Sequence, residues 1–280
     1  MALLLTADGS GLQRVGRGLS FAGTAGPSFD ADAATYIAAV EAADGQALEA
    51  ATQTAINTFV VGCKADGNWN AIKAACILAG ARTLSGALVP LAGPAPINNN
   101  FVSADYNRKT GLIGDGATKY LNSNRLNSAD PQNSKHICVY ATVAPSTTGQ
   151  WRSLMGSVPV TGIGRSDIEY STTYTGYAQN ANSNNQSTYT AKTAGFIGVS
   201  RNSSSSQTAR SNGTNASSSS SSAAGDTNRI YVFARHFNGY NPEQWCNPRL
   251  SFYSIGEAVD LALLDARVTT LMADLATAIP

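Results

Sequence analysis

The clearest pattern of apolar and polar positions lies between His136 and Val143. Ile137, Val139, Ala141 and Val143 alternate with His136, Cys138, Tyr140 and Thr142, and this period of two predicts a half-buried antiparallel strand. Two short strands precede it, at 111–114 and 119–121, separated by the Asp115-Gly116 turn. A long polar loop closed by Asp130-Pro131 leads into the alternating run.

Between residues 29 and 80 the apolar positions recur instead at helical spacing. A first helix is predicted from Asp30, which can cap it, to Gly45, and a second ends at Asp66-Gly67. A third is predicted from Asn68 to Gly80 and carries Trp69. The three apolar stripes are Ala33, Tyr36, Ile37 and Val40; Leu48, Thr52, Ala55, Ile56, Phe59, Val60 and Cys63; and Ile72, Cys76 and Ile77. Helices this short have to bury such stripes to be stable.

Residues 85–100 are rich in proline and asparagine and are predicted to be a connector. Beyond Arg108 the chain predicts a series of short strands separated by Gly, Asn and Ser turns, roughly 8–12 residues apart, as in a sandwich or jelly roll. Two serine tracts, 203–206 and 217–222, are predicted to be hairpin loops. The later strands are expected at 150–157, 167–172, 176–179, 187–191, 195–201, 207–211, 229–235 and 249–255.

The chain ends in a predicted helix that begins with the capping box Ser254-x-x-Glu257. Its apolar positions follow intervals of three and four, which produce a short heptad seam. The seam either packs on the chain's own sandwich and N-terminal helices or joins copies of the chain. The residues of this candidate oligomer seam are Leu261, Leu264, Val268, Leu271 and Leu275, followed by Ala278.

These elements together predict an α+β protein: an N-terminal extended arm and short helical segment, an antiparallel β-sandwich of the jelly-roll type, and a C-terminal helix. The expected divisions are a flexible arm at 1–28, a helical segment and connector at 29–100, the β-sandwich at 101–256 and the helix at 257–280. The arm is glycine-rich and lacks sustained periodicity, so it is expected to become ordered only against another surface.

The composition disfavours several classes of partner and site. Charged residues make up only 13% of the chain and the net charge is +1, which disfavours nucleic acid and anionic membranes as partners. No apolar run is long enough to insert into a membrane, and the Leu3–Leu5 run is too short for a signal peptide, so synthesis in a cytoplasm is expected. The cysteines lack metal-ligand spacing, so buried thiols are expected, with no metal and no cofactor. They are Cys63, Cys76, Cys138 and Cys246.

Several runs of the sequence resemble a known domain. They are NTFVVGCKADGNWNAIKAACILAGARTL, GLIGDGATKYLNSNRLNSADPQNSKH, GFIGVSRN followed by ARSNG, and LSFYSIGEAVDLALLDARVTTL. They resemble a concanavalin A-like lectin/glucanase, or laminin G-like, jelly roll found in structural proteins of tailed bacteriophages, particularly cyanophages. The resemblance implies a virion component of a tail, fibre or capsid surface, made in the host cytoplasm. It would act as a homo-oligomer through contacts with copies of itself and other virion proteins.

Enzymatic activity is not expected from these residues. Glucanases of this fold carry a Glu-x-Asp-x-(x)-Glu arrangement along one strand, which supplies the two carboxyl groups of the retaining mechanism. Here Asp167 and Glu169 share a strand face, but Arg165 stands where the leading acid would be. The pair is therefore interpreted as the solvated face of an exposed strand. His136 and His236 are not accompanied by a GxSxG nucleophile motif.

The alternative function is that of a lectin-like module of a tail fibre that binds a host surface glycan or a receptor. Sugar recognition requires aromatic faces for stacking beside amides and hydroxyls. Tyr174, Tyr177 and Tyr189 lie among Asn and Gln residues, and Trp245 lies in a later loop. These four are the candidate glycan- or partner-binding residues, although an exposed sheet face has the same composition.

Overall fold

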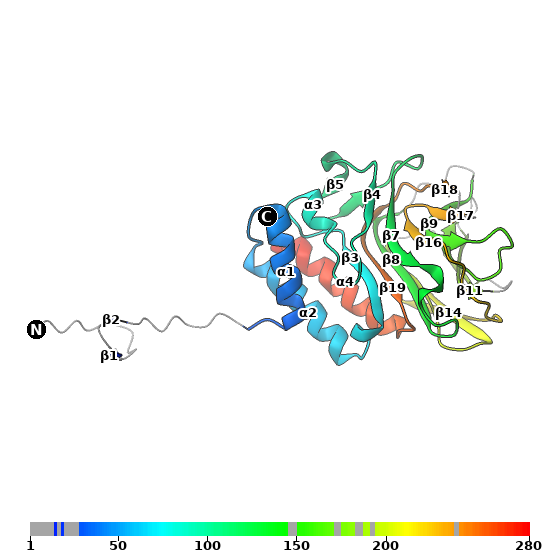
Figure 1. Cartoon of the computed structure of the whole chain (residues 1–280), viewed down its shortest axis with the longest axis horizontal. Helices are drawn as coiled ribbons and strands as arrows, with labels where there is room; N and C mark the ends of the chain where they lie inside the picture. The colour runs from blue at the N-terminus through cyan, green and yellow to red at the C-terminus, as the bar shows by residue number, and fades with distance from the viewer. Residues whose placement is uncertain are drawn as a thin grey trace, which may run out of the picture.

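The computed structural model describes residues 14–15, 18–19, 28–144, 150–170, 175–182, 187–190, 194–237 and 241–280. Three layers lie side by side: a group of helices, a sheet that the helices cover on one face, and a second sheet on the other side of the first (Figure 1). The chain is therefore an α+β protein built on an antiparallel β-sandwich with a C-terminal helix, as predicted.

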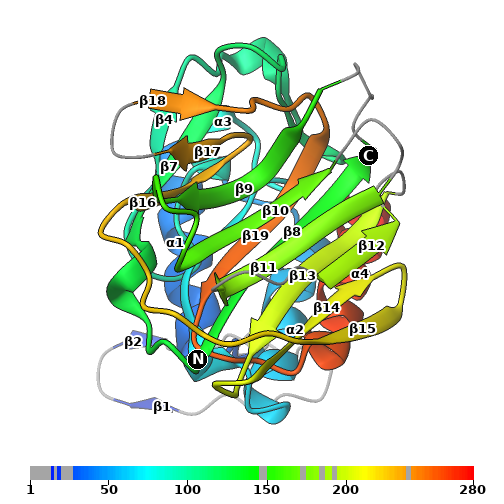
Figure 2. The same cartoon turned by 90° about the vertical axis from the view of Figure 1, so that its right-hand side faces the viewer.

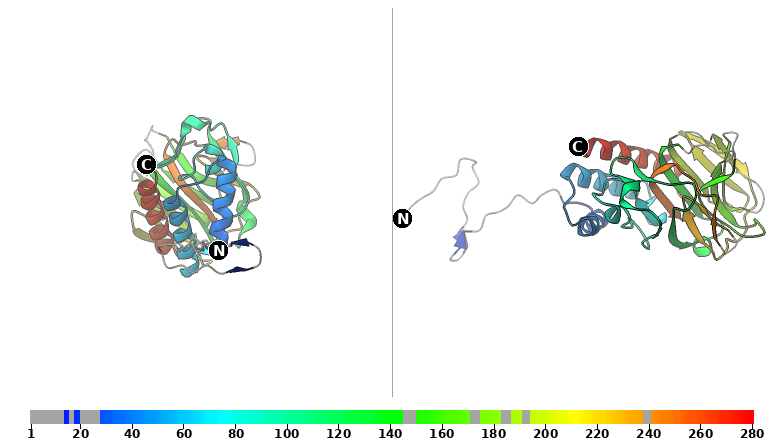
Figure 3. Two further views of the ribbon diagram at one scale, coloured as in Figure 1. Left: turned by 90° about the vertical axis from the view of Figure 1, so that its left-hand side faces the viewer. Right: turned by 90° about the horizontal axis from the view of Figure 1, so that it is seen from above.

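The three long helices, two from the N-terminal part of the described chain and one from its C-terminal end, lie side by side on one face of the sandwich (Figure 3). α1 begins after Asp30, whose side chain accepts a hydrogen bond from the Asp32 backbone, and ends at Gly45 in the left-handed conformation at φ 67°. α1 and α2 bury the predicted stripes, so both helix predictions are confirmed. No helix in the described ranges combines the length and the apolar character needed to cross a bilayer. The helices are α1 (Ala31–Asp44), α2 (Ala50–Ala65), α3 (Leu84–Ala87) and α4 (Leu261–Ala278), with 3-10 turns η1 (Trp69–Ala71), η2 (Ser103–Asp105) and η3 (Asn127–Ala129).

The described strands form two large sheets, of nine and eight strands, and one separate pair. The nine-stranded sheet contains, in order, β12 (Ser187–Thr190), β11 (Thr175–Asn182), β10 (Arg165–Tyr170), β9 (Arg152–Val158), β16 (Arg229–Val232), β7 (Tyr120–Leu126) and β4 (Ile97–Asn99), with β17 (Arg235–Phe237) and β18 (Asn241–Glu243) beside β9. The eight-stranded sheet contains β15 (Thr214–Ser219), β14 (Ser206–Ser211), β13 (Gly195–Arg201), β8 (Lys135–Val143), β19 (Arg249–Gly256), β6 (Gly111–Ile113) and β5 (Tyr106–Asn107), with β3 (Ile72–Ile77) beside β19. β1 (Arg14–Val15) pairs with β2 (Gly18–Leu19), and the rest of the predicted arm up to residue 27 lies outside the described residues.

β8 is the alternating run of the sequence, and it lies in the middle of the fold. Ile137, Val139 and Ala141 face the core between the two sheets, whereas Cys138 faces the core under the helices. The expectation of a half-buried strand is wrong here, because the helices cover the face that would otherwise be solvated. Both faces of β8 are therefore buried.

The third predicted helix is wrong: residues 72–77 form β3, which pairs antiparallel with β19. β3 is nearly continuously apolar because helices cover one face and the second sheet covers the other. A strand buried on both faces lacks alternation and resembles a buried helix in sequence. The predicted helical segment 29–100 thus contributes β3 and β4 to the sandwich.

Three boundaries also differ from the sequence expectations. The polar stretch from Asn122 continues β7 as far as Leu126, with Ser123 facing inward and donating to the Ile230 carbonyl. Ser217–Ser219 belong to the edge strand β15, whose largely solvent-facing side chains give no apolar signal. The capping box does not form, because Ser254 lies in β19 and Asp260 caps α4 instead, accepting from the Ala262 and Leu263 amides.

The apolar seam of α4 is buried inside the chain. α4 packs along α2 so closely that a Cβ placed on Gly62 would lie 2.8 Å from the Arg267 side chain. The seam side chains therefore do not form an oligomer contact, and the alternative of packing on the chain's own helices and sheet is confirmed. Their exposed fractions are 4% for Leu261, 0% for Leu264, Val268 and Leu275, and 1% for Leu271.

We expect Val268→Ala to lower the free energy of unfolding by about 2 kcal/mol without changing the oligomeric state, because the lost methyl groups leave a cavity in a buried cluster. Val61→Ala is the matched control, since Val61 of α2 is 46% exposed. Urea denaturation and light scattering provide the two measurements. A change in molecular mass with unchanged stability would contradict the intramolecular packing.

Candidate functional site

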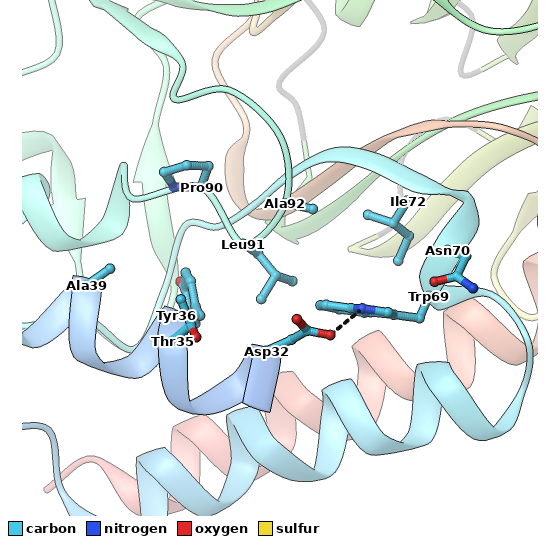
Figure 4. Close-up of a pocket in the computed structure, with 10 residues that line it drawn as sticks. All are labelled: Asp32, Thr35, Tyr36, Ala39, Trp69, Asn70, Ile72, Pro90, Leu91 and Ala92. Carbon is cyan, nitrogen blue, oxygen red and sulfur yellow. Dashed lines mark hydrogen bonds between the residues drawn. The ribbon is translucent and has the colours of Figure 1, made fainter. Parts of the chain in front are cut away.

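A hollow of about 380 Å³ lies where α1, η1 and the segment after α3 meet. Trp69 from η1 reaches toward Asp32 of α1, and Ile72 and Leu91 point into the same space (Figure 4). The segment carrying Leu91 is fixed to β3, because the Leu91 amide donates to the Ala75 carbonyl at 2.8 Å. The remaining lining residues are Thr35, Tyr36, Ala39, Asn70, Pro90 and Ala92.

The turn after α2 positions Trp69. Gly67 has φ 75°, a left-handed conformation that a side chain would strain, and it reverses the chain at the end of α2. Asn68, 4% exposed, then binds the backbone of Asp260 twice: its Oδ1 accepts from the amide at 3.1 Å and its Nδ2 donates to the carbonyl at 3.3 Å. Asn68, the residue before Trp69, is thus bound to the N-cap of α4, 192 residues later in the chain.

Charged groups orient the indole. Trp69 Nε1 donates to Asp32 Oδ2 at 2.9 Å, and Lys64 Nζ lies 2.6 Å from the same oxygen and 2.7 Å from Asp30 Oδ1. Lys64 Nζ is also 5.7 Å from the Trp69 ring centroid, within the range of a cation–π contact. Hydrogen bonds to Asp30 and then to Asp32 raise the pKa of Lys64, so its ammonium group stays charged at neutral pH.

The hollow combines an aromatic ring with polar groups at its rim. The exposed Asn70 amide makes no hydrogen bond within the described residues. The Thr35 hydroxyl donates to the Ala31 carbonyl and can still accept a hydrogen bond. Apolar walls with a few oriented polar groups are typical of small-ligand sites. This arrangement fits a ligand with one apolar face and hydroxyl groups at its edge.

The structure places two of the four predicted glycan-binding residues, Tyr189 and Trp245, and neither lies at the hollow. Tyr189 is 8% exposed and faces the core between the sheets, where its hydroxyl donates to the Glu169 carbonyl at 3.1 Å. This prediction is wrong for Tyr189 because strand register places it on the inward face of β12. Trp245 is partly buried, and its backbone carbonyl accepts from Arg152. Tyr174 and the side chain of Tyr177 lie outside the described residues.

The acidic pair of β10 is buried rather than solvated: Asp167 is 0% exposed and Glu169 4%. Arg165 Nη2 lies 2.8 Å from Asp167 Oδ2 and 3.0 Å from Glu169 Oε1, and Arg235 Nη1 lies 3.2 Å from Glu169 Oε2. Arg235 also pairs with Glu243 through the β17–β18 hairpin, which lies beside β9 (Figure 2). Arg235 of this hairpin thus binds Glu169, which the sequence suggested was exposed. The pKa of Glu169 is raised to about 7, mainly by burial and next by the charge of the neighbouring Asp167.

Comparisons with known proteins identify no relative by sequence. No model of a protein family and no curated protein matches this chain.

Several solved structures are similar to part of this chain, all at low identity. A mutant of the Trypanosoma rangeli sialidase with trans-sialidase activity matches with a TM-score of 0.48 and 9% identity, over 79% of this chain and 39% of that chain. The botulinum neurotoxin serotype D binding domain gives 0.46 and 11%, over 72% and 52%. Domains LG4-5 of the mouse laminin alpha1 chain give 0.34 and 12%, over 62% and 47%. This chain spans about half or less of each of those chains, so its ligand class has to be inferred from its own side chains.

The sequence pattern did not reveal the Trp69 hollow, because Trp69 was placed inside a helix that does not form. The available signal was Asp66-Gly67-Asn68, a turn that ends α2 and leaves the next residues outside regular structure. An aromatic residue directly after such a turn is held on a short 3-10 segment. The partners Asp32 and Leu91, however, come from elements more than 20 residues away on either side.

Proposed function

We propose that this chain is a non-enzymatic carbohydrate-binding module and that a saccharide binds in the hollow around Trp69. The observation that carries the proposal is the oriented indole beside an unpaired amide and a carboxylate. A pyranose ring presents C–H groups to an aromatic face and hydroxyl groups to surrounding acceptors and donors, and Asn70 and Thr35 supply both. The Ile72 and Leu91 side chains supply apolar surface to the same hollow.

The carboxylates support binding rather than catalysis. Glycoside hydrolysis needs one carboxyl group that can donate a proton to the leaving oxygen and a second that acts as nucleophile or base. Both oxygens of Glu169 contact guanidinium groups, and the Asp30 and Asp32 carboxylates bind Lys64. Neither pair leaves two free carboxyl groups facing one ligand. We therefore propose that the chain releases no sugar from a bound glycan.

The resemblance to structural proteins of tailed phages extends the proposal to a place of action. A carbohydrate-binding module on a tail fibre or capsid surface would attach the particle to a host surface glycan. The phage origin, the homo-oligomer and the contacts with other virion proteins stay predictions. Co-purification of the chain with phage particles is the measurement that tests them.

We expect Trp69→Ala to weaken saccharide binding by at least about tenfold, equivalent to about 1.4 kcal/mol, because the stacking surface is lost. Asn70→Ala is expected to weaken binding severalfold with an unchanged melting temperature, since its exposed side chain has no partner to lose. Binding to a glycan array and then titration of the strongest array member measure both effects.

Trp151→Ala is the matched control. Trp151 is a 44% exposed tryptophan that precedes β9 of the nine-stranded sheet, and it does not line the Trp69 hollow. This variant is expected to bind like the unmodified chain. The proposal is overturned if no array member binds, or if binding persists in both Trp69→Ala and Asn70→Ala.

A further inference from the structure

A second hollow adjoins the first one at Trp69. It has a volume of about 240 Å³ and is lined by Asp32, Lys64, Gly67, Trp69 and Asn70. Three of these residues, Asp32, Trp69 and Asn70, also line the larger hollow of about 380 Å³. The two hollows thus meet at these three residues on either side of the indole, and together they are here called the Trp69 groove.

The two ends of the Trp69 groove differ in character. The larger end has apolar walls from Ile72, Leu91 and Pro90, whereas the smaller end is lined by Lys64 and the bare backbone of Gly67. Lys64 lies toward the smaller end of the groove and within cation–π distance of the ring. A ligand that contacts both ends has to extend past Trp69, as two consecutive sugar rings would.

The three linked charges at the smaller end of the groove, Asp30, Asp32 and Lys64, add to −1. Asp32 and Lys64 line the groove, whereas Asp30 lines neither hollow but binds Lys64 Nζ at 2.7 Å, and Asp32 binds the same ammonium at 2.6 Å. Hydrogen bonding to Lys64 lowers the pKa of Asp30, so this carboxylate stays ionised at neutral pH. A ligand carboxylate placed here would meet the unbalanced negative charge with no free cation to pair with among the lining residues.

Resting on the proposed function, we propose that the Trp69 groove binds at least two consecutive units of an uncharged oligosaccharide and discriminates against sugars that carry a carboxylate, such as sialic and uronic acids. The discrimination comes from charge repulsion rather than from a clash. It therefore decreases with added salt and when the excess carboxylate is removed.

The test is a glycan array with matched pairs that differ only in a terminal sialic acid, probed with the full chain at low and physiological salt. The uncharged member of each pair is expected to bind at least about tenfold more tightly, and a disaccharide more tightly than its monosaccharide. Asp32→Asn removes one negative charge while keeping an oxygen to accept from Trp69, so it is expected to reduce the ratio within each pair. Asp274→Asn, an exposed aspartate of α4, is the charge-matched control and should leave the ratio unchanged.

The outcomes separate the two proposals. Equal binding of both members of each pair, or a ratio unaffected by Asp32→Asn, overturns the charge discrimination and leaves the carbohydrate-binding function intact. A monosaccharide that binds as tightly as its disaccharide overturns the two-unit groove. Absence of binding to every array member overturns the proposed function and this inference with it.

Discussion

Arg201→Met is expected to lower the free energy of unfolding by about 3–5 kcal/mol. Arg201 ends β13 with 0% of its surface exposed, and no carboxylate pairs with it within the described residues. Uncharged backbone and side-chain oxygens instead accept its hydrogen bonds and so solvate the buried cation in place of water. The acceptors are the carbonyls of Asn180 at 2.7 Å, Ser203 at 3.0 Å, Ser206 at 3.2 Å and Ser220 at 2.8 Å, together with Gln207 Oε1 at 3.4 Å and Ser220 Oγ at 3.0 Å.

The size of the effect follows from what remains after the substitution. Methionine fills much of the space but donates no hydrogen bond, so several buried carbonyls lose their partner, each costing roughly 1–3 kcal/mol when water cannot replace it. Arg201, in the eight-stranded sheet, also joins the backbone of β11 in the nine-stranded sheet to Ser203 before β14 and Ser220 after β15, so a connection between the two sheets is lost.

Urea denaturation measures this effect, with Arg229→Met as the control, because Arg229 of β16 is exposed. The control is expected to change stability by less than about 0.5 kcal/mol. Arg201→Lys keeps the charge but loses most of the donors, so it should remain strongly destabilised. If Arg201→Met unfolds at the same urea concentration as the control, the carbonyl cage is not what stabilises this end of the sandwich.

The helix stripes and strand spacing predicted most of the fold, because they record which residues are buried. The stripe of α1 from Ala33 to Val40 and that of α2 up to Cys63 are buried as expected. The prediction failed at β3, where both faces are covered and the pattern no longer alternates. It also failed at β15, where neither the serines nor their spacing marks a strand.

The candidate site was less predictable because its contacts join distant parts of the chain. Asp167 and Glu169 looked solvated since nothing near them in sequence indicates Arg235, 66 residues after Glu169, or the hairpin that carries it. Tyr189 looked exposed because its neighbours are polar, yet its register turns it inward. The position of Trp69 depends on the contact between Asn68 and Asp260, which are 192 residues apart. Local pattern predicts burial, but it does not predict which buried or half-buried groups meet.

Two buried groups are expected to give the stability of this protein opposite dependences on pH that cancel between pH 4.5 and 6.5. His136 of β8 is 0% exposed, its Nε2 lies 2.7 Å from the Ser254 hydroxyl, and burial lowers its pKa to about 4. Since the unfolded chain takes up a proton on histidine near pH 6.5, acidification favours unfolding. The stabilising contribution of neutral His136 is therefore present above pH 6.5 and lost as the pH falls to about 4.

Glu169 acts in the opposite direction. Its pKa is raised to about 7 by burial and by Asp167, whereas in the unfolded chain it titrates near 4.5. The folded chain therefore takes up a proton as the pH falls from 7, and this contribution to stability is complete below pH 4.5 and lost as the pH rises through 7. Each shift corresponds to about 3 kcal/mol, since one pKa unit equals about 1.4 kcal/mol.

Single substitutions are expected to separate the two slopes. His136→Gln should leave only the Glu169 contribution, so the free energy of unfolding rises by about 3 kcal/mol as the pH falls from 7 to 4.5. Glu169→Gln should leave only the His136 contribution, so the free energy of unfolding falls by a similar amount over the same range. Urea denaturation at several pH values measures the free energy of unfolding of the unmodified chain and of each variant. Each value is expressed relative to that of the same protein at pH 7, which removes any constant cost of the substitution. Hydrogen bonds to Arg108 lower the pKa of Glu49 to about 2, so folded Glu49 does not titrate between pH 4.5 and 7. If both variants keep the flat profile of the unmodified chain, His136 and Glu169 do not titrate as their burial requires.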